Sequence, residues 1–116
     1  MIIQLPFPHK ALWPNGDKAH WRVVSDQKKK HKAWAYATAL AALGGQKFVP
    51  SGDKIAIRLT VSSKPKGPEC DRDNAVAAMK VYIDGIALAI GVNDRLFDAP
   101  IVHFSGRQSN FTIEVG

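Results

Sequence analysis

The stretch DKIAIRLTVSSKPKGPECDRDNAVAAMKVYIDG, residues 53 to 85, decides the fold. In residues 55 to 61, large apolar side chains occupy every second position, which predicts a strand with one largely buried face. Residues 63 to 70 are rich in Pro and Gly and lack large apolar side chains, so they predict a surface loop. A helix is expected to open near Asp73 or Asn74, with Gly85 and Gly91 as competing ends.

The flanking segments predict the remaining elements. Residues 2 to 8 read as a short strand, and their two prolines exclude a central place in a sheet. A loop follows, with turn chemistry at residues 14 to 16. A helix is expected from Ser25 or Asp26 until Gly44 stops it, and residues 101 to 105 and 111 to 115 read as two closing strands. The fold class is therefore α/β (α+β), in the order β-α-β-α-β-β, with two helices and a small mixed sheet of about four strands.

Size and composition predict one globular domain over residues 1 to 116. Apolar residues make up 46% of the 116 residues, and charged residues only 22%. Cys70 is the single cysteine, so no intrachain disulfide can form, which fits a reducing cytosol. No apolar run approaches the roughly 18 residues of a membrane span, and the opening residues lack a secretion signal. A soluble cytoplasmic protein, with no membrane partner, is expected.

The net charge of +6 is concentrated in the first part of the chain. Residues 1 to 47 hold eight Lys or Arg against two Asp, whereas residues 48 to 116 hold eight basic and eight acidic residues. Six of the ten acids fall between Glu69 and Asp98. A basic half beside an acidic centre suits an enzyme that grips phosphate around a metal, and an uneven solvated surface shows the same imbalance.

Helical periodicity places Asp73, Lys80 and Asp84 on one stripe, with Lys80 and Asp84 each within ~20° of the azimuth of Asp73. Lys80 lies ~10 Å along the axis from Asp73, and Asp84 ~16 Å, so the two aspartates cannot ligate one ion. A metal at the start of this helix would use Asp71, Asp73 and a ligand from elsewhere. Carboxylates suit Mg²⁺, which would polarise a phosphodiester and activate water, while Lys80 would stabilise the developing anion.

A purely structural reading of the DRDN sequence (71–74) stays open. Asp and Asn at a helix start satisfy free backbone N–H groups without any metal. Other metal sites fit poorly: Val76 stands where a calcium EF-hand loop needs Gly, and Cys70 has no partner cysteine for zinc. The four histidines are scattered along the chain, which favours surface or packing roles.

The pattern DRDN–x5–K–x3–DG at residues 71 to 85, followed by GVND at 91 to 94, resembles the RusA family of Holliday junction resolvases, particularly its phage and prophage members. The opening LPFP and WPNGDKAHW segments (5–8 and 13–21) are similar to that family as well, so the likeness runs from about Ile2 to Val115. The resemblance implies a small homodimeric α/β endonuclease that cuts four-way DNA junctions with Mg²⁺, or with Mn²⁺ in its place.

The resemblance also implies roles for particular residues. Asp71, Asp73 and Asp94 match the three metal-binding, catalytic aspartates, and Lys80 matches the catalytic lysine. Asn74 is expected to support the metal-binding aspartates or to cap the helix, and Asp84 is expected to have a structural role. Many members carry a pair of aspartates where this chain has Asn93 and Asp94. If the first aspartate of that pair is the essential one, this chain lacks it. The spacing from Asp73 to Lys80 is longer than in the best-known bacterial form and suits the phage type.

The basic segment is expected to contact phosphates. The predicted DNA-binding residues are Lys18, Arg22, Lys28, Lys29, Lys30 and Lys32. The four lysines from 28 to 32 span two helical faces, which suits broad backbone contact better than base reading. Trp13 and Trp21 are candidates for stacking on unpaired bases, and Trp34 for core packing.

A geometric constraint follows from three aspartates on one ion. A helix unbroken to Ile90 would end ~25 Å from Asp73, and the four steps from there to Asp94 span at most ~14 Å. We therefore expect the helix to end between Asp84 and Leu88, or a partner chain to supply Asp94.

The predicted function is a Mg²⁺-dependent endonuclease that resolves branched DNA in recombination and repair. The alternatives are a basic nucleic-acid-binding protein without catalysis, and a metal-dependent nuclease with a substrate other than a junction.

Overall fold

The structure is a computed structural model that describes residues 1–14 and 20–116. Its elements, in chain order, are β1 (Ile2–Pro6), the 3-10 turn η1 (Lys10–Leu12), α1 (Trp21–Leu43), β2 (Ile57–Ser62), α2 (Arg72–Ile90), the 3-10 turn η2 (Asp94–Leu96), β3 (Ile101–Phe104) and β4 (Asn110–Val115). This order confirms the predicted β-α-β-α-β-β arrangement of a mixed α+β fold. The turn predicted at residues 14 to 16 falls largely outside the described residues, as does Lys18.

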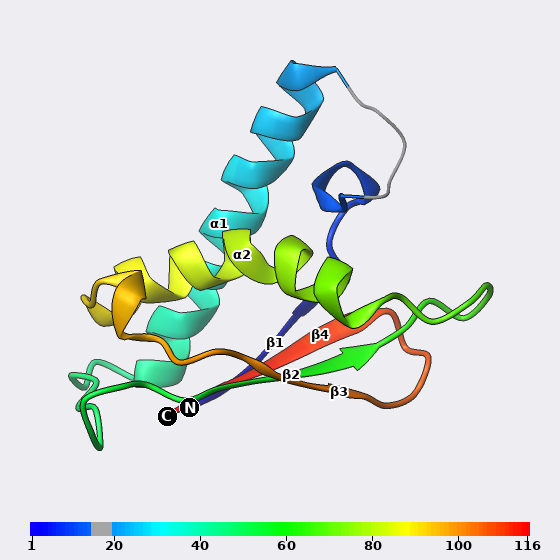
Figure 1. Cartoon of the computed structure of the whole chain (residues 1–116). Helices are drawn as coiled ribbons and strands as arrows, with labels where there is room; N and C mark the ends of the chain where they lie inside the picture. The colour runs from blue at the N-terminus through cyan, green and yellow to red at the C-terminus, as the bar shows by residue number, and fades with distance from the viewer. Residues whose placement is uncertain (15–19) are drawn as a thin grey trace.

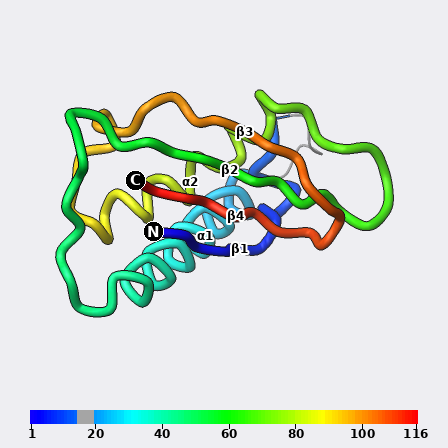
Figure 2. Tube along the Cα trace, turned by 90° about the horizontal axis from the view of Figure 1, so that it is seen from below, coloured from blue at the N-terminus to red at the C-terminus, as the bar shows by residue number. Residues whose placement is uncertain are grey.

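The four strands form one mixed sheet in the order β1-β4-β2-β3. β2 and β3 are parallel, whereas β4 pairs antiparallel with both β1 and β2. β1 lies at an edge, as its prolines predict. The two closing strands are not neighbours, because β4 lies between β1 and β2. Both helices cover the same face of the sheet (Figure 1). The two chain ends lie side by side (Figure 2), and the Met1 amino group donates to the Val115 carbonyl at 3.0 Å.

The core fills the space between this sheet face and the helices. Alternate strand residues are buried, including Leu59 and Val61 on β2 and Phe111 on β4. Tyr82 on α2 is fully buried between the helix and the sheet. Its hydroxyl donates to the Pro6 carbonyl at 2.6 Å, which ties α2 to the edge strand. Within the described ranges, no helix combines the length and the apolar content that crossing a bilayer requires.

Helix α2 runs past Gly85 to Ile90, so of the two competing ends Gly91 is confirmed, and the alternative of an end between Asp84 and Leu88 is wrong. Gly85 instead lies at a close contact between α2 and α1. A Cβ atom at this position would overlap the Lys32 carbonyl oxygen and lie 3.0 Å from the Ala35 Cβ. The helix ends at Gly91, which takes the left-handed conformation that favours glycine and donates its N–H to the Ala87 carbonyl.

Helix α1 begins at Trp21, before the predicted start at Ser25 or Asp26. The cap is His20, whose Nδ1 accepts the Arg22 N–H at 3.2 Å. Nothing between residues 20 and 26 breaks a helix, so an unusual histidine cap is enough to start it early. The predicted end is confirmed, since Gly44 closes the helix in the left-handed conformation.

Replacing Gly85 by alanine is expected to destabilise the fold by about 1–3 kcal/mol, because the added methyl group forces α1 away from α2. The measurement is the free energy of unfolding in urea. Gly52→Ala is the matched control, since a Cβ at residue 52 meets no atom within 4 Å. A Gly85 variant as stable as the control would show that the helices do not depend on this close crossing.

His31 of α1 is buried against α2 and joins α1 to the turn after β1. Its Nε2 accepts the His9 backbone N–H at 3.2 Å, and its Nδ1 lies 2.8 Å from the Gln27 carbonyl. A carbonyl only accepts, so Nδ1 carries the proton and the ring is neutral. Burial lowers the pKa of His31 below its ordinary value. A protonated ring would present a second N–H to the His9 amide and lose that hydrogen bond.

The free energy of unfolding is therefore expected to depend on pH through His31. Because the folded pKa is lowered, this contribution is complete above about pH 6.5 and is lost as the pH falls from there through the folded pKa. Urea unfolding at pH 7.5 and pH 5.0 measures the difference. His31→Gln keeps one acceptor and one donor without titrating, so its stability should fall less. His103→Gln, at an exposed position of β3, is the matched control for the substitution itself.

Candidate nucleic-acid interface and carboxylate site

A basic groove of about 450 Å³ lies between the two helices. Helix α1 supplies Lys28, Lys29 and Lys32 to its wall, and α2 supplies Lys80 and Asp84. Ala77, about one turn before Lys80 on α2, also lines the groove, so these three α2 residues follow the stripe that helical periodicity predicts. Asp73 lies one turn before Ala77 on the same stripe. Asp73 does not itself line the groove, whose α2 lining begins one turn later at Ala77.

The other predicted DNA contacts lie outside this groove. Lys30 points elsewhere on α1, and its Nζ lies 4.9 Å from the centre of the Trp34 ring. Arg22 lies over the ring of Trp21 at 5.4 Å. Trp21 is 67% exposed, at the end of α1 that projects beyond the body of the molecule (Figure 1). Lys18 lies outside the described residues.

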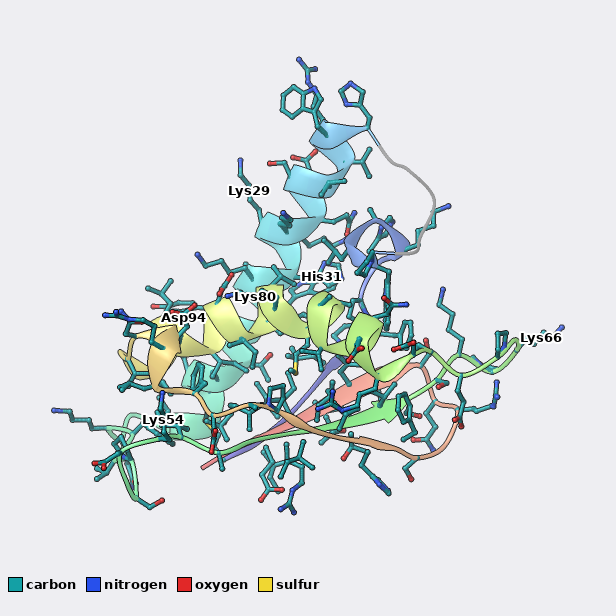
Figure 3. The ribbon with its side chains drawn as sticks, viewed as in Figure 1. Lys29, His31, Lys54, Lys66, Lys80 and Asp94 are labelled. Carbon is teal, nitrogen blue, oxygen red and sulfur yellow. The ribbon has the colours of Figure 1, made fainter. Side chains whose placement is uncertain are left out.

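Lys80 forms the centre of a small ionic cluster that joins α2 to η2. Its Nζ contacts Asp84 Oδ1 at 3.0 Å and Asp94 Oδ2 at 3.2 Å. The hydrogen bond to Asp84, together with that to Asp94, raises the pKa of Lys80, so the ammonium stays charged. Figure 3 shows Lys80 and Asp94 close together, with Lys29 above them on α1. Lys80 thus lies at the rim of the basic groove, already held by two carboxylates.

Asp71 and Asp73 begin α2, and both have local partners. Asp71 is the N-cap, and its Oδ1 accepts the Asp73 N–H at 2.7 Å. This is the capping role that the DRDN pattern leaves open. The Asp73 carboxylate lies 3.3 Å from the Arg72 guanidinium and remains 88% exposed. Asn74 is half-buried beside them.

The single chain does not bring Asp94 to Asp71 and Asp73. Because α2 continues to Ile90, Asp94 reaches Lys80 and Asp84, ~10–16 Å along the axis from the start of the helix. Among the residues that the structure describes, no group of three or more His, Cys, Asp or Glu side chains could hold a metal ion. Of the two arrangements that the sequence allows for three aspartates on one ion, only completion by a second chain remains.

Asn93 has a structural role in this chain. Its side-chain oxygen accepts the Arg95 N–H at 3.0 Å and caps the η2 turn that follows. That turn presents Asp94 to Lys80. An aspartate would make the same capping bond, so an asparagine here preserves the local geometry of the Asp94 turn.

A second pocket, of about 490 Å³, lies beside Asp71 and was not predicted from the sequence. Its lining residues are Phe7, Lys10, Trp13, Lys64, Pro68, Glu69, Cys70, Asp71 and Asn74. They come from three separate segments, so no local pattern could have revealed them. Burial raises the pKa of the Cys70 thiol, which keeps that residue protonated.

The chain is similar to a protein of Xylella fastidiosa that carries the description "Uncharacterized protein". The two are 36% identical over 97 residues, which cover 82% of this chain and 61% of the relative. The chain therefore spans less than two thirds of the relative's length. No protein-family profile matches the chain.

Proposed function

We propose that this chain is a Mg²⁺-dependent endonuclease of branched DNA that acts on four-way junctions as a homodimer. The observation that carries the proposal is the position of the basic groove on α2. Lys80 and Ala77 line that groove, and Asp73 lies one turn before Ala77 on the same stripe of α2. A DNA backbone held by the lysines would therefore pass close to the carboxylates.

The groove has the chemistry of a phosphate-binding surface. Lys28, Lys29 and Lys32 approach it from one helix and Lys80 from the other. Lysines contact a phosphate backbone as point charges and do not read base edges in a fixed geometry. Such a surface supports recognition of DNA shape, which is what a junction-selective enzyme needs, and its affinity depends strongly on salt.

The donors at the start of α2 suit a magnesium ion. Asp71 uses one oxygen for the cap and retains a second, and Asp73 is exposed. When bound, Mg²⁺ supplies Lewis-acid polarisation of the phosphodiester and a more acidic water. Two carboxylates are enough to bind Mg²⁺ together with substrate phosphate and waters. Asp94 of a second copy would complete the set of three that the resemblance to RusA implies.

Lys80 has two parts in this proposal. Its ammonium is charged, because the contacts with Asp84 and Asp94 raise its pKa. In the free protein it orients the Asp94 carboxylate. With DNA in the groove, it offers positive charge to a phosphate oxygen, where developing negative charge is stabilised best. Asp84 supports Lys80 from one turn away on the same helix.

A nucleic-acid-binding protein without catalysis is the second candidate function. The engagement of Asp71 in the helix cap and of Asp73 with Arg72 favours it. In that case the carboxylates only begin the helix, and the basic groove accounts for the whole activity.

A cleavage assay separates these functions. End-labelled four-way junction and linear duplex are incubated with the protein in Mg²⁺ or in chelator. The proposal predicts paired nicks in the junction only, dependent on Mg²⁺. Asp73→Asn should lower the rate by roughly 100-fold or more, since a metal's Lewis acidity is worth several kcal/mol, while junction binding persists. Binding without cutting would support the second function, and equal cutting of linear duplex would indicate a nuclease with another substrate.

A mixing experiment tests whether the site is shared between copies. Asp73→Asn and Asp94→Asn proteins should each be inactive alone. In a mixed dimer with shared sites, one site loses both aspartates and the other keeps all three. The mixture should therefore regain single-strand nicking, with few paired cuts. If both proteins are inactive alone and the mixture stays inactive although mixed dimers form, each site is built within one chain and the shared site is wrong.

The groove lysines are expected to dominate DNA affinity. Replacing Lys28, Lys29 and Lys32 by glutamine should weaken binding to all sequences alike, and should reduce the slope of log K against log salt by roughly 2 to 3. The control with the same charge change replaces Lys47, Lys54 and Lys66, none of which lines the groove. Figure 3 shows Lys54 and Lys66 at opposite ends of the molecule. Equal losses in both triple variants would mean that net charge, and not the groove, binds DNA.

A further inference from the structure

The pocket beside Asp71 is built from three segments that are distant in sequence. Phe7, Lys10 and Trp13 belong to the segment after β1, Lys64 to Cys70 contribute the loop after β2, and Asp71 and Asn74 begin α2. The pocket is thus separate from the basic groove, and it opens next to one of the two carboxylates at the start of α2. Three features of its wall point to one class of ligand.

The first feature is a rigid aromatic wall. The rings of Phe7 and Trp13 are stacked, with centroids 5.0 Å apart and an angle of 18° between their planes. Both meet the buried Phe111 ring edge-on, at 5.4 and 5.9 Å. The Trp13 Nε1–H donates to the Pro8 carbonyl at 3.0 Å, which fixes the indole. Half-buried rings held in this way are a ready surface for stacking.

The second feature is positive charge at the pocket. Lys10 and Lys64 are both exposed and both line it. The Lys64 ammonium lies 5.6 Å from the centre of the Phe7 ring. The loop that carries Lys64 is held by Arg107, whose guanidinium donates to the carbonyls of Lys64 at 3.2 Å and Gly67 at 2.5 Å. An anion beside the aromatic wall would therefore meet two lysines. Lys10 lies on the η1 turn, and Lys64 lies on the loop that Arg107 holds in position.

The third feature is a set of hydrogen-bonding groups that also line the pocket. Glu69 offers carboxylate oxygens, and Asn74 offers an amide that both donates and accepts, whereas Asp71 serves the helix cap and the proposed metal. Such groups match the amino, carbonyl and ring-nitrogen atoms on the edge of a nucleobase. A ring surface, two cations and edge-reading polar groups together describe a nucleotide site.

We propose that this pocket holds one unstacked nucleotide, with its base against the Phe7–Trp13 wall and its phosphate near Lys10 and Lys64. The inference rests on the proposed action on DNA and deepens it. A base inside a duplex is stacked on both faces and cannot enter, so only an unpaired or flipped nucleotide can occupy the pocket. Occupancy would place the adjoining phosphate beside Asp71, which makes the pocket a source of selectivity for branched over linear DNA.

The test follows the Trp13 indole N–H by NMR, with the peak assigned by its absence in Trp13→Phe. Titration with deoxyadenosine 5′-monophosphate, in chelator, should shift this peak, and deoxyribose 5-phosphate should not shift it comparably. Lys64→Ala should weaken the nucleotide by several-fold. Lys66→Ala is the matched control, because Lys66 lies at the outer end of the same loop (Figure 3) and does not line the pocket.

The same measurement with DNA separates this inference from the proposed function. A junction carrying 2-aminopurine at the branch point should change in fluorescence on binding, and Trp13→Leu should reduce the change by roughly 10-fold. If the junction is bound and nicked but neither the nucleotide nor the junction affects Trp13, the pocket assignment is overturned and the nuclease stands. If the pocket binds the nucleotide but no junction is cut, the nuclease fails and the pocket stands.

Discussion

The close crossing of α1 over α2 at Gly85 is the constraint on which the other features depend. Hydrogen is the only substituent that fits between α2 and the backbone of α1 at Lys32. The approach is supported by small buried residues, among them Ala35 and Ala39 on α1 and Ala78 on α2. With larger side chains the helix axes would separate, since helix spacing follows the residues at the contact. The groove exists because the lysines of α1 emerge directly beside the polar stripe of α2.

The sequence pattern was sufficient to predict the helices and strands, but not where each helix begins and ends. Strand alternation predicted β2, and prolines placed β1 at an edge. The position of β4 between β1 and β2 depends on contacts among segments far apart in the chain, which no local pattern carries. For α2, two glycines satisfied the same stop rule. Choosing Gly91 over Gly85 required knowing that a second helix lies against Gly85, which is tertiary information.

Some features of the candidate site were likewise predictable from the sequence, and others were not. Helical periodicity correctly aligned Lys80 and Asp84, because an unbroken helix fixes azimuth from residue number alone. The partner of Asp94 was not predictable from that rule, since it depends on where the chain turns after α2. Trp13 was expected from the sequence to stack on unpaired bases, but the pocket around it was not predicted, because Trp13 and Lys64 are brought together only by the packing of two loops. A site is predictable from sequence to the extent that one regular element carries it.

The dense acids in a basic chain now have a physical account under the proposed function. A DNA backbone held in the lysine groove would pass about one helical turn from Asp73, and a phosphate and a carboxylate so close repel one another unless a cation stands between them. Exposed carboxylates without such a cation would oppose the binding for which the lysines are placed. Lys80 resolves the conflict for Asp84 and Asp94 by contacting both. Among the described residues, Asp71 contacts the helix start and Asp73 contacts Arg72, and a divalent ion is the partner that would turn their repulsion of DNA into attraction.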